Sequence, residues 1–138
     1  MASSPHQLRL RVRYGETDQM GVVHHANYLS YMEDGRTRLM AEKGCSYAEL
    51  ERQGFGLPVR RAELRYWAPA YYDEELLVMT SVRGMRSASV TFEYEIQNAA
   101  GKRLATGVVE LACVSLNSDQ RKPISLPEHL RSVLSEEA

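Results

Sequence analysis

Apolar and polar residues alternate near the start of the chain, and this pattern predicts a strand over residues 7–14. The apolar members share one face, and they are Leu8, Leu10, Val12 and Tyr14. Arginines occupy the positions between them, and such period-two alternation is typical of a strand with one buried face. A loop over residues 15–23, with a glycine near each end, follows.

A helical pattern begins after this loop. Its apolar residues recur every three or four positions at Tyr28, Met32, Gly35 and Leu39. Its opposite side carries Ser30, Glu33, Asp34, Thr37 and Arg38, with Arg36 at pairing distance from Glu33. The spacing predicts an amphipathic helix, with Asn27 as its N-cap and Gly44 as the C′ residue that ends it. Because glycine costs about 1 kcal/mol relative to alanine inside a helix, Gly35 predicts a close approach to a sheet. A capping box at residues 46–49 predicts a short second helix that ends at Gly54.

Four further strands are expected after Gly56. They cover residues 57–67, 74–83, 88–97 and 104–116. Residues 98–102 contain Gly101 and form the expected turn of a hairpin. The last strand is apolar on both faces apart from Glu110, which predicts a central strand covered on both sides. Residues 128–134 are expected to form a final short helix.

The predicted order is one strand, a long helix, a short helix and four strands with short connections. Hairpin-linked strands are antiparallel, and one amphipathic helix laid across such a sheet gives an α+β domain. The 138 residues suit a single domain, in which residues 1–6 and 135–138 are expected to be flexible. Because the helix covers only one face, we expect a second subunit to cover part of the rest.

Composition excludes several classes of protein. The chain is 43% hydrophobic and 25% charged, with a net charge of −1, so it lacks the basic excess of a protein that binds nucleic acid or acidic membranes. Cys45 and Cys113 lie too far apart for a disulfide framework or a zinc site, and we expect both to be reduced. No apolar run approaches the roughly 20 residues of a membrane span. The first residues lack a secretory signal, so a cytoplasmic location is expected.

Asp18 is the candidate catalytic residue, because it lies shortly before the long helix. The first N–H groups of a helix have no partner inside it and carry partial positive charge. They can hold a carbonyl oxygen while a carboxylate acts on the carbonyl carbon. The alternative is a carboxylate that only caps the helix. Glu16 and Asp34 are weaker candidates for the same role.

The neighbours of Asp18 extend this candidate site. We expect His25 to hydrogen-bond near Asp18 or the substrate, whereas His24 lies either in the pocket or on the surface. The pair has neither the spacing nor the partners of a zinc motif, so no metal is expected. The hydroxyl of Tyr14 is expected either to reach Asp18 across the turn or to belong to a packed aromatic ring.

The segment from Tyr14 through Thr17-Asp18, Gly21-Val-Val-His24-His25 and Asn27-Tyr28 resembles the hotdog-fold thioesterases. It looks closest to the YbgC-like branch and the related 4-hydroxybenzoyl-CoA thioesterases, and the likeness runs from about Leu8 to Leu130. The resemblance implies a five-stranded antiparallel sheet wrapped around one long helix. It also implies that two subunits pair edge to edge into a continuous sheet, as a homodimer or a homotetramer, with active sites at the dimer interface.

The same resemblance implies hydrolysis of acyl-CoA thioesters to a carboxylic acid and CoA, without metal or organic cofactor. The catalytic carboxylate of the family matches Asp18, and Tyr14 and His25 match pocket positions of the YbgC-like branch. Gly21, Val23 and His24 are expected to contact the substrate. Many relatives carry Tyr or Trp before the second of these histidines, so the shape of the acyl pocket stays open.

Arg83, Arg86, Ser87 and Ser89 lie at a strand turn, where they form either a CoA-binding cluster or a solvated turn. Guanidinium groups suit the phosphates of CoA. Further basic candidates are Arg60, Arg61, Arg121 and Lys122. Asp18 acts either as a nucleophile or as a general base. Three other functions stay open: an acyl carrier protein thioesterase, a hydratase or dehydratase, and a non-catalytic acyl-binding module.

Overall fold

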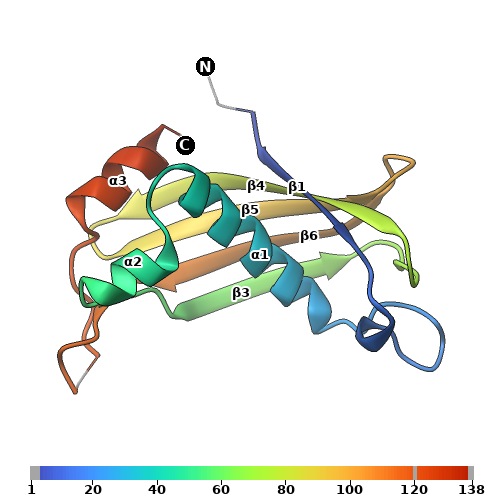
Figure 1. The fold of residues 1–138 in the computed structure, drawn as a ribbon, viewed down its shortest axis with the longest axis horizontal. Coiled ribbons are helices and arrows are strands. Elements are labelled where there is room, and N and C mark those ends of the chain that lie inside the picture. Colours follow the sequence, from blue (N-terminus) through green and yellow to red (C-terminus); the bar gives the residue numbers. More distant parts are fainter. Residues whose placement is uncertain (1–3, 120, 137–138) are drawn as a thin grey trace.

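A single antiparallel sheet of five strands forms the body of the protein. The computed structural model describes residues 4–119 and 121–136. The strands are β1 (His6–Arg11), β3 (Val59–Tyr66), β4 (Glu75–Arg86), β5 (Ser89–Asn98) and β6 (Arg103–Ala112). They lie in the order β1-β4-β5-β6-β3, and helix α1 (Asn27–Glu42) crosses one face of the sheet (Figure 1). The expected α+β arrangement is confirmed.

Smaller elements close the ends of the sheet. They are η1 (Tyr14–Glu16), α2 (Tyr47–Arg52), β2 (Phe55–Gly56), β7 (Val114–Ser115) and α3 (Glu128–Ser135). The expected cap of α2 is confirmed, because the Ser46 hydroxyl accepts the N–H of Glu49 at 3.2 Å. The second, two-stranded sheet pairs β2 with β7. Apart from η1, which lies beside the start of α1, these elements gather at the opposite end of the main sheet (Figure 1).

The core lies between α1 and the inner face of the sheet. Alternate residues of β4 and β5 are buried there, and they are Leu76, Val78, Thr80, Val82, Val90, Phe92, Tyr94 and Ile96. A Cβ atom on Gly35 would overlap the Thr80 hydroxyl and lie 3.1 Å from Val78 Cγ1. The helix therefore approaches the sheet closely at Gly35, as its sequence predicts.

The segment that leads into α1 differs from the prediction. Strand β1 ends at Arg11 instead of Tyr14, because the N–H of Arg13 donates to Glu16 Oε1 at 2.8 Å and starts η1. Asn27 is not the N-cap of α1: it is the first helical residue and follows Ala26. Its side-chain amide donates instead to the Glu16 carbonyl oxygen at 2.9 Å. Gly44 follows the helix with a φ of 80°, as expected of the C′ residue.

The last long strand also differs from the prediction. The central strand is β5, and β6 lies second from the edge. Its outward residues are Thr106, Val108 and Glu110, so that face is mostly polar and the two-sided apolar prediction was wrong. The chain ends β6 at Ala112 and pairs again as β7, because the N–H of Cys113 turns to the Ala88 carbonyl oxygen at 2.8 Å.

The ends of the described chain are more regular than expected. His6 begins β1 and Ser135 ends α3, whereas the expectation of flexibility at residues 1–3, 137 and 138 lies outside the described residues. Cys45 and Cys113 are both free and buried. Of the helices that the structure describes, none combines the length and the apolar character needed to span a membrane.

Candidate functional site

Asp18 lies in a tight loop that backbone hydrogen bonds hold in place. The Asp18 N–H donates to the Val22 carbonyl oxygen at 2.9 Å, and the Gly21 N–H donates to the Asp18 carbonyl oxygen at 3.0 Å. Gly21 has a φ of 79°, which favours glycine at this turn. A bridge between Val22 and Tyr71 ties the loop to the segment before β4. The position of the Asp18 backbone is therefore fixed by neighbours on both sides.

The carboxylate of Asp18 keeps most of its hydrogen-bonding capacity. Its Oδ1 accepts the N–H of Met20 at 2.9 Å, and the side chain is half-buried. The N–H that orients this carboxylate thus belongs to its own loop, and Asp18 does not cap α1, whose N-cap residue is Ala26. A carboxylate oxygen that remains open can act on a substrate or on water.

Several backbone donors at the start of α1 find acceptors just before the helix. The N–H groups of Asn27 and Tyr28 donate to the carbonyl oxygens of His24 and His25, at 2.9 and 3.3 Å. The N–H of Ala26 donates to His24 Nδ1 at 3.3 Å. Across the described part of the chain, the N–H of His25 has no acceptor. The backbone N–H of His25 is therefore a candidate donor to a carbonyl oxygen.

Glu16 ties the loop to α1, a role that sequence reasoning did not assign to it. Its Oε1 accepts the Tyr31 hydroxyl at 3.0 Å. Its carbonyl oxygen accepts the N–H of His24 at 2.9 Å. Burial and this bond to Glu16 raise the pKa of Tyr31. These contacts give Glu16 a structural role, which agrees with its weaker rank as a catalytic candidate.

Tyr66, at the end of β3, supports the same turn. Its hydroxyl donates to the His25 carbonyl oxygen at 3.1 Å, and its ring meets Tyr28 edge to face at 5.2 Å. Burial raises the pKa of Tyr28, although a hydrogen bond to the Ala70 backbone opposes that effect. No local signal in the sequence pairs Tyr66 with a residue 41 positions away.

Four predicted site residues in or beside this loop differ in exposure. The Tyr14 side chain is 77% exposed, and its ring packs edge-on against Tyr72 at 5.5 Å. In the single chain Tyr14 is therefore a mostly exposed ring with one aromatic neighbour. The rings of His24 and His25 lie 4.3 Å apart on the exposed surface. Val23 is only 5% exposed, so its side chain belongs to the core and is not available to a substrate.

The predicted CoA cluster lies at the other end of the sheet. Arg86 lies ten positions along β4 from Leu76, the neighbour of Leu10 at the end of β1. At ~3.3 Å per residue this is about 33 Å. Ser89 is 3% exposed and therefore packs, and the Ser87 carbonyl oxygen accepts the N–H of Leu126 at 2.9 Å. One chain does not bring Asp18 and this cluster together.

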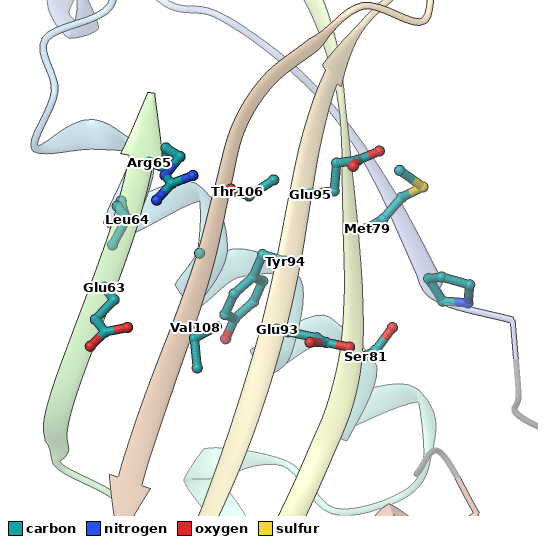
Figure 2. A pocket seen from close by; sticks show the side chains of 12 residues that line it. Glu63, Leu64, Arg65, Met79, Ser81, Glu93, Tyr94, Glu95, Thr106 and Val108 are labelled. Carbon is teal, nitrogen blue, oxygen red and sulfur yellow. The ribbon is translucent and has the colours of Figure 1, made fainter. Parts of the chain in front are cut away.

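Arg83 and Arg86 line an open cavity of about 420 Å³ on the outer face of the sheet, where Arg61 joins them. Another outer cavity, of about 490 Å³, lies further along the same face between Glu63, Glu95 and their neighbours (Figure 2). Residues 14–26 line none of the cavities described here. None of these cavities therefore adjoins the Asp18 loop.

Among the described residues, no three or more His, Cys, Asp or Glu side chains come together in a way that would hold a metal ion.

Comparison with known proteins gives the family. Residues 12–134 match the model of the thioesterase-like superfamily. The chain belongs to this superfamily.

Individual thioesterases support the assignment. The chain is 37% identical to YneP of Bacillus subtilis, over 83% of its own length and 82% of that protein. It is 33% identical to the acyl-CoA thioester hydrolase YbgC of Escherichia coli, over 88% and 89% of the two chains. The solved DHNA-CoA thioesterase of Staphylococcus aureus is 36% identical, with a TM-score of 0.83 over 87% of this chain and 79% of that one. The expected YbgC-like hotdog thioesterase is confirmed.

Proposed function

We propose that the protein hydrolyses acyl-CoA thioesters to a carboxylic acid and free CoA. The YbgC relative, matched over nearly nine-tenths of both chains, supports this reaction. The observation that carries it is the half-buried Asp18 carboxylate, which uses a single N–H of its own loop and shares that loop with the open N–H of His25.

The chemistry follows from these two groups. The thioester carbonyl oxygen accepts the His25 N–H, which is worth roughly 3 kcal/mol when negative charge develops on that oxygen. Asp18 either takes a proton from the attacking water or attacks the carbonyl carbon itself. The second route forms an acyl–aspartyl anhydride, which water hydrolyses after CoA has left to release the acid and restore Asp18. The C–S bond then breaks, and the CoA sulfur leaves readily because a thiol has a pKa of about 8.5. No step needs a metal or an organic cofactor.

The active assembly in this proposal is a pair of subunits joined along β3. Within one chain, the arginines suited to CoA phosphates lie at the end of the sheet far from Asp18. A second subunit beside β3 supplies that far end to the first. Arg83 and Arg86 of one subunit then hold the nucleotide of a thioester cleaved by Asp18 of the other. A dimer of two such pairs completes the proposed homotetramer.

The proposal places the protein in the cytoplasm. Two free, buried cysteines support a reducing compartment. An acyl carrier protein is the alternative carrier of the thioester. A basic surface would be needed for that acidic partner, and the exposed arginines of the sheet are consistent with either carrier.

Replacing Asp18 with Asn tests the reaction. We expect turnover to fall by about 10²- to 10⁴-fold, because the amide neither attacks nor takes a proton. Thiol release should be followed over acyl-CoAs of several lengths, benzoyl- and hydroxybenzoyl-CoA and an acyl carrier protein thioester. Hydration of crotonyl-CoA in the same panel identifies a hydratase.

Glu16→Gln is the matched control for this variant. It removes a neighbouring carboxylate that bonds Tyr31 and the Arg13 backbone. We expect it to lower the melting temperature while keeping most of the turnover. Near wild-type turnover in Asp18→Asn would refute the assignment, and binding without turnover in the wild type would indicate an acyl-binding module.

A further inference from the structure

The Asp18 loop is a small hairpin with its base at Glu16 and His24. At the base, the His24 N–H donates to the Glu16 carbonyl oxygen at 2.9 Å. The two arms pair again further along, where the Asp18 N–H donates to the Val22 carbonyl oxygen at 2.9 Å. Asp18 therefore lies on one arm of this hairpin, and His25 directly follows the other arm.

A short turn connects this hairpin to α1. Within it, the N–H of Asn27 donates to the His24 carbonyl oxygen at 2.9 Å. This carbonyl belongs to the same planar peptide unit as the His25 N–H, so the bond fixes the direction in which that N–H points. A peptide unit that accepts a hydrogen bond at its oxygen is also a stronger donor at its nitrogen. The backbone of Asn27 therefore orients the proposed donor to the thioester carbonyl.

The side chain of Asn27 makes a second connection, from the helix back to the base of the hairpin. Its amide nitrogen donates to the Glu16 carbonyl oxygen at 2.9 Å. The same oxygen accepts the His24 N–H, and a carbonyl oxygen has two lone pairs with which to accept both. Asn27 is half-buried. One residue thus ties the first turn of α1 to the hairpin just before Asp18.

This side-chain bond serves the hairpin more than the helix. Asn27 is the first residue of α1, and its own N–H already has an acceptor at His24. The N-cap residue of the helix, Ala26, makes no capping bond through its side chain. The amide of Asn27 therefore sets the geometry between the helix start and the Asp18 loop. Because the acceptor is a backbone carbonyl, only a substitution of Asn27 removes this bond.

We propose that Asn27 is a positioning residue for thioester hydrolysis, whose side-chain amide holds the His25 N–H in a fixed place relative to the Asp18 carboxylate. This proposal rests on the proposed function and adds a residue to its site. The N–H binds the carbonyl oxygen while Asp18 acts on the carbonyl carbon or on water, so both groups must keep one geometry with respect to the same thioester. The Asn27 side chain supplies that geometry by joining their two supports.

Replacing Asn27 with alanine tests this role. Alanine favours a helix, and the Tyr31 hydroxyl still bonds the Glu16 carboxylate, so α1 should stay in place. We expect kcat for an acyl-CoA to fall about ten- to a hundredfold, because small displacements of reacting groups are costly, while KM stays within twofold. The matching acyl-pantetheine should show the same fall, because the bond acts on the thioester and not on the nucleotide. An unchanged kcat, or a rise in KM alone, would overturn the proposal.

Asn98→Ala is the matched control for a loss of stability. The Oδ1 atom of Asn98 accepts the N–H groups of Ala100 and Lys102, both at 3.0 Å, in the turn between β5 and β6. This substitution therefore removes the side-chain bonds of an asparagine from a different turn. We expect it to lower the melting temperature at least as much as Asn27→Ala while kcat stays at the wild-type value. An equal fall of kcat in both variants would trace the effect to stability and overturn the positioning role.

Amide hydrogen exchange tests the Asn27 bond without any substrate. In Asn27→Ala the base of the hairpin should open more readily, so the His24 N–H should exchange at least fivefold faster than in the wild type. The amide groups of β5 should exchange at unchanged rates. Equal exchange at His24 in the two proteins would overturn the proposal. If the wild type hydrolyses no thioester, the proposed function fails, while the exchange rate at His24 still decides whether Asn27 holds the loop.

Discussion

Arg36 shows at the scale of one residue how the core accommodates a charge. The sequence pairs it with Glu33 on the helix surface, and that contact exists at 3.7 Å. However, Arg36 is only 4% exposed, and it donates to the hydroxyls of Tyr47 at 3.0 Å and Tyr94 at 3.3 Å. Two neutral acceptors thus satisfy a buried guanidinium, which would otherwise be strongly unfavourable.

Tyr94 gives this cluster a measurable pH dependence. Burial raises its pKa to about 12, although the neighbouring Arg36 opposes the shift. Because the folded pKa lies above the unfolded value near 10, the stabilisation is complete below pH ~10 and is lost as the pH rises toward 12. The free energy of unfolding should fall by up to about 3 kcal/mol over this range.

Urea denaturation of the wild type and of Tyr94→Phe at several pH values isolates the contribution of Tyr94 to the free energy of unfolding. We expect a shallower decline in the variant between pH 10 and 12, whatever its stability at pH 7. Equal slopes in the two proteins would show that Tyr94 does not titrate in this way.

At the scale of elements, the contact between α1 and β4 depends on Gly35. Gly35→Ala should destabilise the protein by about 1–3 kcal/mol, although alanine favours a helix, because the added Cβ would overlap the Thr80 hydroxyl. Thermal unfolding of the double variant with Thr80→Ala should recover part of the loss. Gly84→Ala is the control, because a Cβ there has nothing within 4 Å. Additive effects of the first pair would contradict the contact.

The sequence predicted these elements well where one local pattern decides them. The period of α1, the alternation of β5 and the Ser46 cap of α2 each depend on near neighbours, and all three are confirmed. It failed where distant groups compete for the backbone. Asn27 bonds the carbonyl oxygen of Glu16 instead of capping the helix, and β6 stops where Cys113 bonds the chain at Ala88.

Some features of the candidate site could also be predicted from local sequence, whereas others depend on contacts between distant parts of the chain. The position of Asp18 before a helix follows from the sequence, and so does the glycine that turns its loop. The open N–H of His25 could not be predicted from the sequence, because it depends on which acceptors the neighbouring N–H groups find in the folded chain. The support from Tyr66 comes from pairing between β3 and β6, which no local pattern encodes.

At the scale of the whole molecule, the two ends of the sheet carry different parts of one proposed site. Arg83 and Arg86 lie in an open cavity far from their own Asp18, so any role in binding CoA requires the second subunit. The guanidinium groups of Arg83 and Arg86 would contact the phosphates of CoA and would not contact the thioester group. The effect of removing them should therefore depend on whether the substrate carries a nucleotide.

The double variant Arg83→Ala/Arg86→Ala should raise KM about tenfold for an acyl-CoA and leave it nearly unchanged for the matching acyl-pantetheine, which lacks the phosphates. Raising the salt concentration should weaken acyl-CoA binding in the wild type more than in the variant, because free ions screen these charges. Arg9→Ala/Arg38→Ala removes the same charge elsewhere and serves as the control. An equal rise in KM for both substrates would mean that the arginines shape the subunit pair, and an unchanged KM for acyl-CoA would place the nucleotide elsewhere on the dimer.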